Sequence, residues 1–137
     1  MKSVLSVDPS RVVRAVIERH LERFDCTMRE ATTADEALAA VREEPPDLLL
    51  IDAGAHAVAA RRNDPAYDGV AVVLLTTAHP ASARHESDAN VVATLQKPFE
   101  QSGFDRAVRS VLGTPIIAMT RDASSRPART AHIGDAR

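Results

Sequence analysis

The stretch Asp47-Leu48-Leu49-Leu50-Ile51-Asp52 decides the fold of this chain of 137 residues. An unbroken apolar run stands between two acids, and Ala53-Gly54-Ala55 follows it. A run this short predicts a strand that is buried on both faces, because a buried helix needs a longer apolar segment. In α/β folds, ligands bind outside the carboxyl ends of parallel strands. Asp52 lies at such an end, so we expect it to belong to a functional site.

Segments with strand and helix character alternate on both sides of this stretch. The other predicted strands are residues 4–7, 27–31, 70–75 and 91–95. The predicted helices are residues 10–24, 33–44, 55–63, 80–89 and 104–112, with a turn-rich loop at 64–69. The capping box Thr33-Ala34-Asp35-Glu36 marks the start of the second helix. The repeated strand-helix unit predicts an α/β fold with a five-stranded parallel sheet, doubly wound, with helices on both faces.

The composition is that of an ordinary soluble globular protein, with 45% hydrophobic and 26% charged residues. The formal net charge of -2 provides no general attraction to nucleic acid or to an anionic membrane. No apolar run approaches the roughly 18 residues that a membrane span needs, and the amino terminus has no signal-peptide shape. Cys26 is the single cysteine, so we expect no internal disulfide and a cytoplasmic location.

The composition changes near the carboxyl terminus. Residues 1–113 carry all the strand-helix units, and we predict that they form one domain. Residues 114–137 are rich in Ser, Arg, Ala and Thr and show no apolar period. They are predicted to be a flexible tail. Because Ile116, Ile117 and Met119 are apolar, a docking segment is the alternative.

Four polar residues stand at or just past the ends of predicted strands: Asp8, Asp52, Thr77 and Lys97. Because the carboxyl ends of parallel strands share one edge of the sheet, we expect these side chains to converge. Two neighbouring carboxylates suit Mg²⁺, which prefers oxygen ligands. An aspartate can act as the nucleophile in phosphoryl transfer, while a hydroxyl and an ammonium stabilise the charge of the transferring group. The edge therefore predicts phosphoryl chemistry on Asp52.

The motifs at this edge resemble those of the response-regulator receiver domain, the phosphoacceptor module of two-component signalling. The matching pieces are Val-Asp-Pro-Ser at 7–10, Asp-Leu-Leu-Leu-Ile-Asp at 47–52, Leu-Leu-Thr-Thr-Ala at 74–78 and Lys-Pro-Phe at 97–99. The resemblance covers residues 1 to about 113 and implies a flavodoxin-like receiver fold. It also implies a signalling module rather than an enzyme, with slow autodephosphorylation as its only turnover.

The resemblance assigns a role to each residue of the edge. It implies that Asp52 is the phosphoacceptor, Asp8 the metal-site acid, Thr77 the switch hydroxyl and Lys97 the cation that binds the phosphoryl group. The Gly54 carbonyl would be a further Mg²⁺ ligand, and the Lys97-Pro98 bond would be cis. The phosphodonor would be a histidine kinase or a phosphotransfer protein. A downstream protein would contact residues 81–112, and the sequence does not decide between a monomer and a homodimer.

Two positions depart from the family pattern. The family usually carries a second acid directly after the residue at Asp8, and this chain has Pro9 there. Thr94 stands where the family commonly has an aromatic residue that moves with the switch threonine. These departures motivate an alternative, a pseudo-receiver that binds a protein partner without being phosphorylated.

A phosphatase of the haloacid dehalogenase type is a further hypothesis, because that family uses Asp, Thr and Lys in the same chain order. That family needs a second acid two residues after the nucleophile, and Gly54 stands there, which argues against this hypothesis.

His56, His79 and His85 share no metal-ligand spacing, so we predict that all three are surface residues. His79 lies two residues past Thr77, where it could tune the rate of dephosphorylation.

Overall fold

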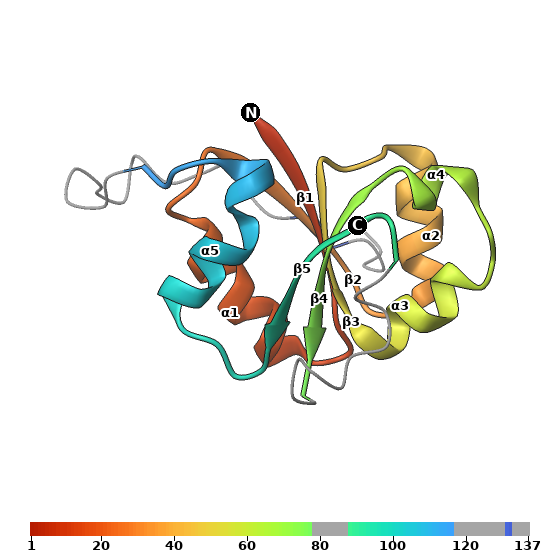
Figure 1. The fold of residues 1–137 in the computed structure, drawn as a ribbon, viewed down its shortest axis with the longest axis horizontal. Helices are drawn as coiled ribbons and strands as arrows, with labels where there is room; N and C mark the ends of the chain where they lie inside the picture. The colour runs from red at the N-terminus through yellow and green to blue at the C-terminus, as the bar shows by residue number, and fades with distance from the viewer. Residues whose placement is uncertain (78–87, 117–130, 133–137) are drawn as a thin grey trace.

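The computed structural model describes residues 1–77, 88–116 and 131–132. Its strands all run parallel in one sheet (Figure 1). They are β1 (Lys2–Val7), β2 (Cys26–Ala31), β3 (Leu48–Asp52), β4 (Ala71–Thr76), β5 (Val91–Gln96) and β6 (Ala131–His132). The strand order is β5-β4-β3-β1-β2-β6. The predicted five-stranded parallel sheet is confirmed, and the two-residue strand β6 adjoins its β2 edge.

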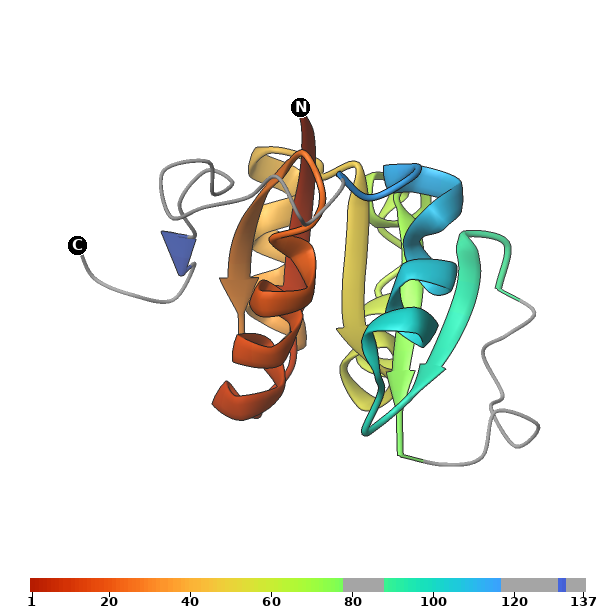
Figure 2. The same cartoon turned by 90° about the vertical axis from the view of Figure 1, so that its left-hand side faces the viewer.

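The helices cover both faces of this sheet, as predicted. They are α1 (Arg11–Leu21), α2 (Ala34–Glu43), α3 (Ala53–Ala60), α4 (Pro65–Asp68) and α5 (Gln101–Leu112). Figure 1 shows α1 and α5 on one side of the sheet and α2, α3 and α4 on the other. The view in Figure 2 looks onto the layer of α1 and α5 with the strands behind it. None of the helices in the described part of the chain has the length and apolar character that a membrane crossing requires.

The central strand β3 is buried on both faces, as its apolar run predicts. Leu48, Leu49, Leu50 and Ile51 are all 0% exposed. Leu49 and Ile51 pack in the core beneath α2, α3 and α4, whereas Leu48 and Leu50 pack in the core beneath α1 and α5. Because successive side chains of a strand point to opposite faces, only a continuous apolar run can serve two cores at once.

Hydroxyl side chains begin the first two helices, and the second is the expected capping box at Thr33. The Ser10 hydroxyl accepts a hydrogen bond from the Val13 amide at 3.2 Å, and the Thr33 hydroxyl accepts one from the Glu36 amide at 3.2 Å. The Glu36 carboxylate reaches back to the Thr32 amide at 2.7 Å. These contacts satisfy amides that have no partner inside the helix, which is why the chain turns into a helix at these residues.

The region after β3 differs from its prediction. Helix α3 begins at Ala53, directly after the strand, rather than at residue 55, and it ends at Ala60 rather than at 63. The predicted loop at 64–69 contains the one-turn helix α4, which begins because the Asp64 carboxylate accepts from the Ala66 amide at 2.9 Å. Residues 80–87 of the predicted helix 80–89 lie outside the described residues. The division at residue 113 stays a prediction.

Candidate functional site

Three of the four predicted edge residues meet at the carboxyl ends of the strands. Asp8 follows β1, Asp52 ends β3 and Lys97 follows β5. The Lys97 ammonium nitrogen, Nζ, donates to Asp8 Oδ2 at 2.8 Å and to Asp52 Oδ1 at 2.9 Å. Asp8 and Asp52 thus share one cation, although Lys97 lies 89 and 45 positions after them in the sequence. The cis Lys97-Pro98 bond that the resemblance implied is also present.

Asp8 lies in the interior, with only 1% of its side chain exposed. Its Oδ1 accepts from the Ser10 amide at 2.8 Å, and its backbone carbonyl accepts from Arg14 Nη1 at 2.7 Å. Arg14 is itself buried and pairs with Glu30 at 2.8 Å. These partners satisfy the Asp8 carboxylate and carbonyl in a part of the molecule that water does not reach.

Lys97 remains a cation in this setting. Burial lowers its pKa, but its hydrogen bonds and its attraction to Asp8 and Asp52 outweigh burial, so the pKa lies above the ordinary value. Two carboxylates and one ammonium leave the cluster with a net negative charge. The cluster is therefore held by attraction to a single positive group that both acids share.

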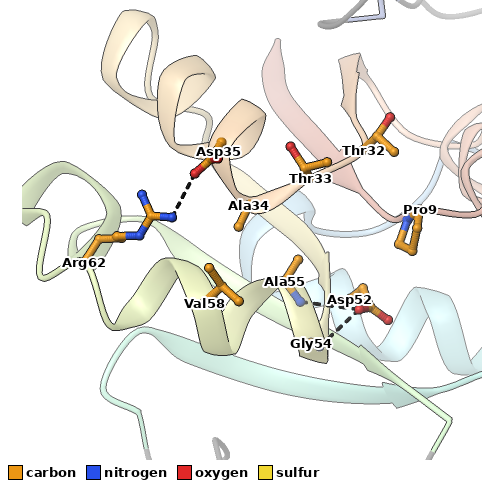
Figure 3. A pocket seen from close by; sticks show the side chains of 10 residues that line it. All are labelled: Pro9, Thr32, Thr33, Ala34, Asp35, Asp52, Gly54, Ala55, Val58 and Arg62. Carbon is orange, nitrogen blue, oxygen red and sulfur yellow. Dashed lines mark hydrogen bonds and ion pairs between the residues drawn. The ribbon is translucent and has the colours of Figure 1, made fainter.

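Asp52 serves a second purpose as the N-cap of α3. Its Oδ2 accepts from the amides of Gly54 at 3.1 Å and Ala55 at 3.4 Å, and Figure 3 draws both contacts. Its Oδ1 faces Lys97. A Cβ atom added to Gly54 would lie 3.1 Å from Asp52 Oδ2, so a larger residue would crowd the carboxylate. One quarter of the Asp52 side chain (25%) is exposed, which leaves the carboxylate open to a reactant.

A cavity of about 390 Å³ opens beside Asp52. Figure 3 shows Pro9 and Asp52 at one end of it and Arg62 and Asp35 at the other. Arg62 Nη2 and Asp35 Oδ1 form an ion pair at 2.9 Å across the ends of α3 and α2. The remaining wall comes from the amino-terminal region of α2 and from α3: Thr32, Thr33, Ala34, Gly54, Ala55 and Val58.

Thr77, the fourth predicted residue, directly follows β4 and is exposed. Its neighbour Thr76 is buried, and the Thr76 carbonyl accepts from the Lys97 amide at 2.7 Å. This backbone bond holds the carboxyl ends of β4 and β5 together, so Thr77 and Lys97 lie at the same edge of the sheet. Its predicted role as a switch hydroxyl stays a prediction.

The donor set suits Mg²⁺ in kind. Asp8 and Asp52 offer carboxylate oxygens, and Mg²⁺ in proteins commonly uses one or two carboxylates and keeps several waters. Within residues 1–77, 88–116 and 131–132, no group of three or more His, Cys, Asp and Glu side chains could hold a metal ion. The Gly54 carbonyl stays a predicted ligand. Gly54 lies in the first turn of α3, directly after Asp52 and Ala53.

The prediction that His56 is a surface residue is wrong. Its side chain is 0% exposed, with Nδ1 2.7 Å from the Tyr67 hydroxyl and Nε2 2.8 Å from Asp88 Oδ2. His56 lies three residues before Ala59, which is buried too, so the two side chains share one face of α3. His79 and His85 lie outside the described residues.

Comparison with known proteins agrees with this geometry. The family model of the response regulator receiver domain matches residues 4–109. A response regulator receiver protein from Burkholderia phymatum is 28% identical, with a TM-score of 0.68, and the match covers 85% of this chain and 99% of that one. The chemotaxis response regulator CheY4 of Vibrio cholerae is 25% identical, with a TM-score of 0.69 and coverage of 82% and 99%.

A third structure shares the fold. It is the receiver domain of the sensor histidine kinase PA1611 from Pseudomonas aeruginosa, with 19% identity, a TM-score of 0.64 and coverage of 82% and 98%. That structure has a magnesium ion coordinated in its active site cleft. The comparison with curated proteins found no match.

Proposed function

Because the chain belongs to the response regulator receiver family, we propose that it accepts a phosphoryl group on Asp52 in two-component signalling. Receiver domains are signalling modules rather than enzymes, and they work through kinases or phosphotransfer proteins and through the domains they regulate. The observation that supports the proposal most is the Lys97 ammonium, which lies 2.9 Å from the partly exposed Asp52 carboxylate. A cation in this place can neutralise a phosphoryl oxygen as it arrives.

The proposed reaction uses groups of this chain in distinct roles. An Asp52 carboxylate oxygen forms a bond to phosphorus while the P–N bond of a donor phosphohistidine breaks, and the imidazole leaves with the electron pair. Lys97 then turns from the carboxylate to a phosphoryl oxygen. The Gly54 and Ala55 amides, already directed at Asp52, are the nearest further donors. Mg²⁺ held by Asp8 and Asp52 would shield the negative charge of the carboxylate from the incoming group.

The remaining roles follow the family pattern. Thr77 would donate its hydroxyl to a phosphoryl oxygen. The donor would be a histidine kinase or a phosphotransfer protein, and the signal would pass to a protein partner through the face formed by residues 81–112. Hydrolysis of the acyl phosphate by water would reset the site slowly.

The test is incubation with acetyl phosphate and Mg²⁺, followed by intact mass. We expect one added phosphoryl group on the wild type and none on Asp52→Asn. Asp47→Asn is the matched control, because Asp47 is the acid at the opposite end of the same apolar run, where it binds Ser3. Unmodified wild-type protein, or labelling that persists in Asp52→Asn, would overturn the proposal.

The second candidate is the pseudo-receiver, which binds a partner without phosphorylation. Pro9 favours it, because a proline next to the buried Asp8 offers no oxygen side chain to a metal ion. Titration with beryllofluoride, followed by amide NMR, separates the two functions. A phosphoacceptor shows shifts at Gly54, Ala55 and Lys97, whereas a pseudo-receiver shows none there.

A further inference from the structure

A polar network lies one helical turn beyond Asp52. It consists of His56 in α3, Tyr67 in α4 and Asp88, which precedes β5. The His56 and Tyr67 rings lie with their centroids 5.7 Å apart, and both side chains are almost completely buried. Tyr67 belongs to the apolar core beneath α2, α3 and α4, with Val58 and Ala59, whereas the Asp88 side chain is 35% exposed and ends the network at the surface.

The direction of the hydrogen bonds in the network follows from the protonation state of His56, taken here as a neutral imidazole. An ionised Asp88 carboxylate can only accept, so His56 Nε2 carries a hydrogen. Burial first, and then the charges of Asp88 and Asp68, raise the pKa of Tyr67, so its hydroxyl keeps its proton. In the neutral imidazole, the Tyr67 hydroxyl then donates to Nδ1. Both ring nitrogens of His56 are satisfied, as a buried imidazole requires.

The network joins three parts of the fold that are separate in the sequence. Tyr67 also accepts from Asn90 Nδ2 at 3.2 Å through its backbone carbonyl. Asn90 in turn accepts from the Val72 amide of β4 at 2.8 Å. The imidazole of His56 therefore ties α3 to α4 and to the backbone that leads from β4 to β5.

Helix α3 has few large side chains that could set its rotation about its own axis. Its sequence is Ala-Gly-Ala-His-Ala-Val-Ala-Ala, so only His56 and Val58 are larger than alanine. Alanine and glycine side chains interdigitate weakly with a neighbouring layer, whereas a doubly hydrogen-bonded ring has one allowed orientation. His56 therefore adds two directed side-chain contacts to the packing of α3, between the Asp52 cap at its start and the Arg62–Asp35 ion pair just past its end.

The rotation of α3 matters at Asp52. The first turn of this helix presents the Gly54 and Ala55 amides to Asp52 Oδ2, at 3.1 and 3.4 Å. A rotated or shifted helix would withdraw these amides, and the carboxylate would lose the constraint that turns its other oxygen toward Lys97. Displacements of about 1 Å at a reacting group can change rates by about 100-fold.

We propose that His56 is a positioning residue for the phosphoacceptor site, acting through α3 to hold the Asp52 carboxylate in its reactive orientation. The effect on phosphorylation rests on the proposed function of Asp52. The effect on the geometry of the unphosphorylated site does not, so the two can be tested apart.

The experiment compares His56→Leu and Tyr67→Phe with the wild type. His56→Leu keeps an apolar volume but loses both hydrogen bonds, and Tyr67→Phe removes only the hydroxyl at Nδ1. The matched control is His20→Leu: His20 lies in α1 on the other face of the sheet, where its Nδ1 is 2.7 Å from Gln101 Oε1. Urea unfolding of each variant defines its stability.

Two readouts follow under conditions in which every variant is folded. Amide NMR of the unphosphorylated proteins reports on Gly54 and Ala55, and the rate of labelling by acetyl phosphate reports on Asp52. We expect displaced Gly54 and Ala55 resonances and a labelling rate lower by about tenfold or more in His56→Leu. Tyr67→Phe should show a smaller change of the same kind, and His20→Leu should show neither.

The outcomes separate positioning from simple stabilisation. Unchanged Gly54 and Ala55 resonances, with unchanged labelling, would overturn the proposal even if the variants are less stable. If wild-type protein is not labelled at all, the proposed function fails and the amide resonances alone decide the inference. If His56→Leu does not fold, Tyr67→Phe decides it, because this variant loses a single oxygen atom.

Discussion

Removal of the Lys97 charge is the most direct test of how this site is held together. Lys97→Met keeps most of the length of the side chain but leaves Asp8 and Asp52 facing each other without a cation. Asp8 has 1% of its side chain exposed, so water cannot replace the lost ammonium there. The Asp52 side chain is 25% exposed and regains part of its hydration. Asp8 therefore accounts for most of the expected loss.

The magnitude follows from the two contacts, at 2.8 and 2.9 Å. Unit charges about 3 Å apart attract by about 5–6 kcal/mol at an effective dielectric constant of about 20. Desolvation of the ammonium offsets a large part of this, and breaking a buried pair costs about 3–5 kcal/mol in other proteins. Because Asp52 is partly hydrated, we expect Lys97→Met to lower the free energy of unfolding by about 2–3 kcal/mol.

Urea unfolding followed by far-ultraviolet circular dichroism measures this loss, since the chain has no tryptophan. With a slope of about 1.5 kcal/mol per molar urea, the midpoint should fall by about 1.3–2 M. Lys2→Met is the matched control: Lys2 is the other lysine and is exposed, so its replacement should change stability by less than about 0.5 kcal/mol.

A double-mutant cycle isolates the pair of Lys97 and Asp8. In an Asp8→Asn background, Lys97→Met should cost about 1–2 kcal/mol less than it does in the wild type, because the buried charge it leaves behind is gone. Strictly additive losses, or a Lys97→Met protein as stable as Lys2→Met, would refute the view that this ammonium holds the two acids together.

Three further predictions concern stability and reactivity elsewhere in the fold. Thr33→Ala removes the cap of α2 and should lower the free energy of unfolding by about 1 kcal/mol in urea unfolding, whereas a loss below about 0.3 kcal/mol would mean that the Thr33 hydroxyl contributes little. Arg14→Met leaves Glu30 without its partner in a largely buried place, so a thermal scan should show a loss of about 3 kcal/mol, and Glu30→Gln should recover part of it in the double variant. Burial raises the pKa of the Cys26 thiol to about 11. The folded chain therefore keeps a proton that the unfolded chain loses above its own thiol pKa of 9.0. The wild type should lose more stability than Cys26→Ala between pH 8 and pH 10, and equal losses would contradict the shifted pKa.

The central strand and the helix caps could be predicted because their signals are local. The apolar run at Leu48–Ile51 can be buried only between two layers. The Thr33 hydroxyl accepts from an amide only three residues later in the chain. The convergence of Asp8, Asp52 and Lys97 also followed, because parallel strands end at one edge whatever their lengths.

The start of α3 and the place of His56 could not be predicted from local signals. An acid at Asp52 reads equally well as a strand end and as a helix cap, and the structure shows that it is both. His56 is a polar residue in a run of alanines, a pattern compatible with either face of a helix. Its burial depends on partners 11 and 32 positions later in the chain.

The sequence by itself determined that this chain folds as a parallel α/β sheet with acids at one edge, since burial of continuous apolar runs leaves no other arrangement open to them. Only the tertiary structure decided that Lys97 binds both acids and that the His56 imidazole is buried beneath α2, α3 and α4. A buried polar group is tolerated only where its partners are already in place. Those partners, Tyr67 and Asp88, come together through the fold and not through their spacing in the sequence.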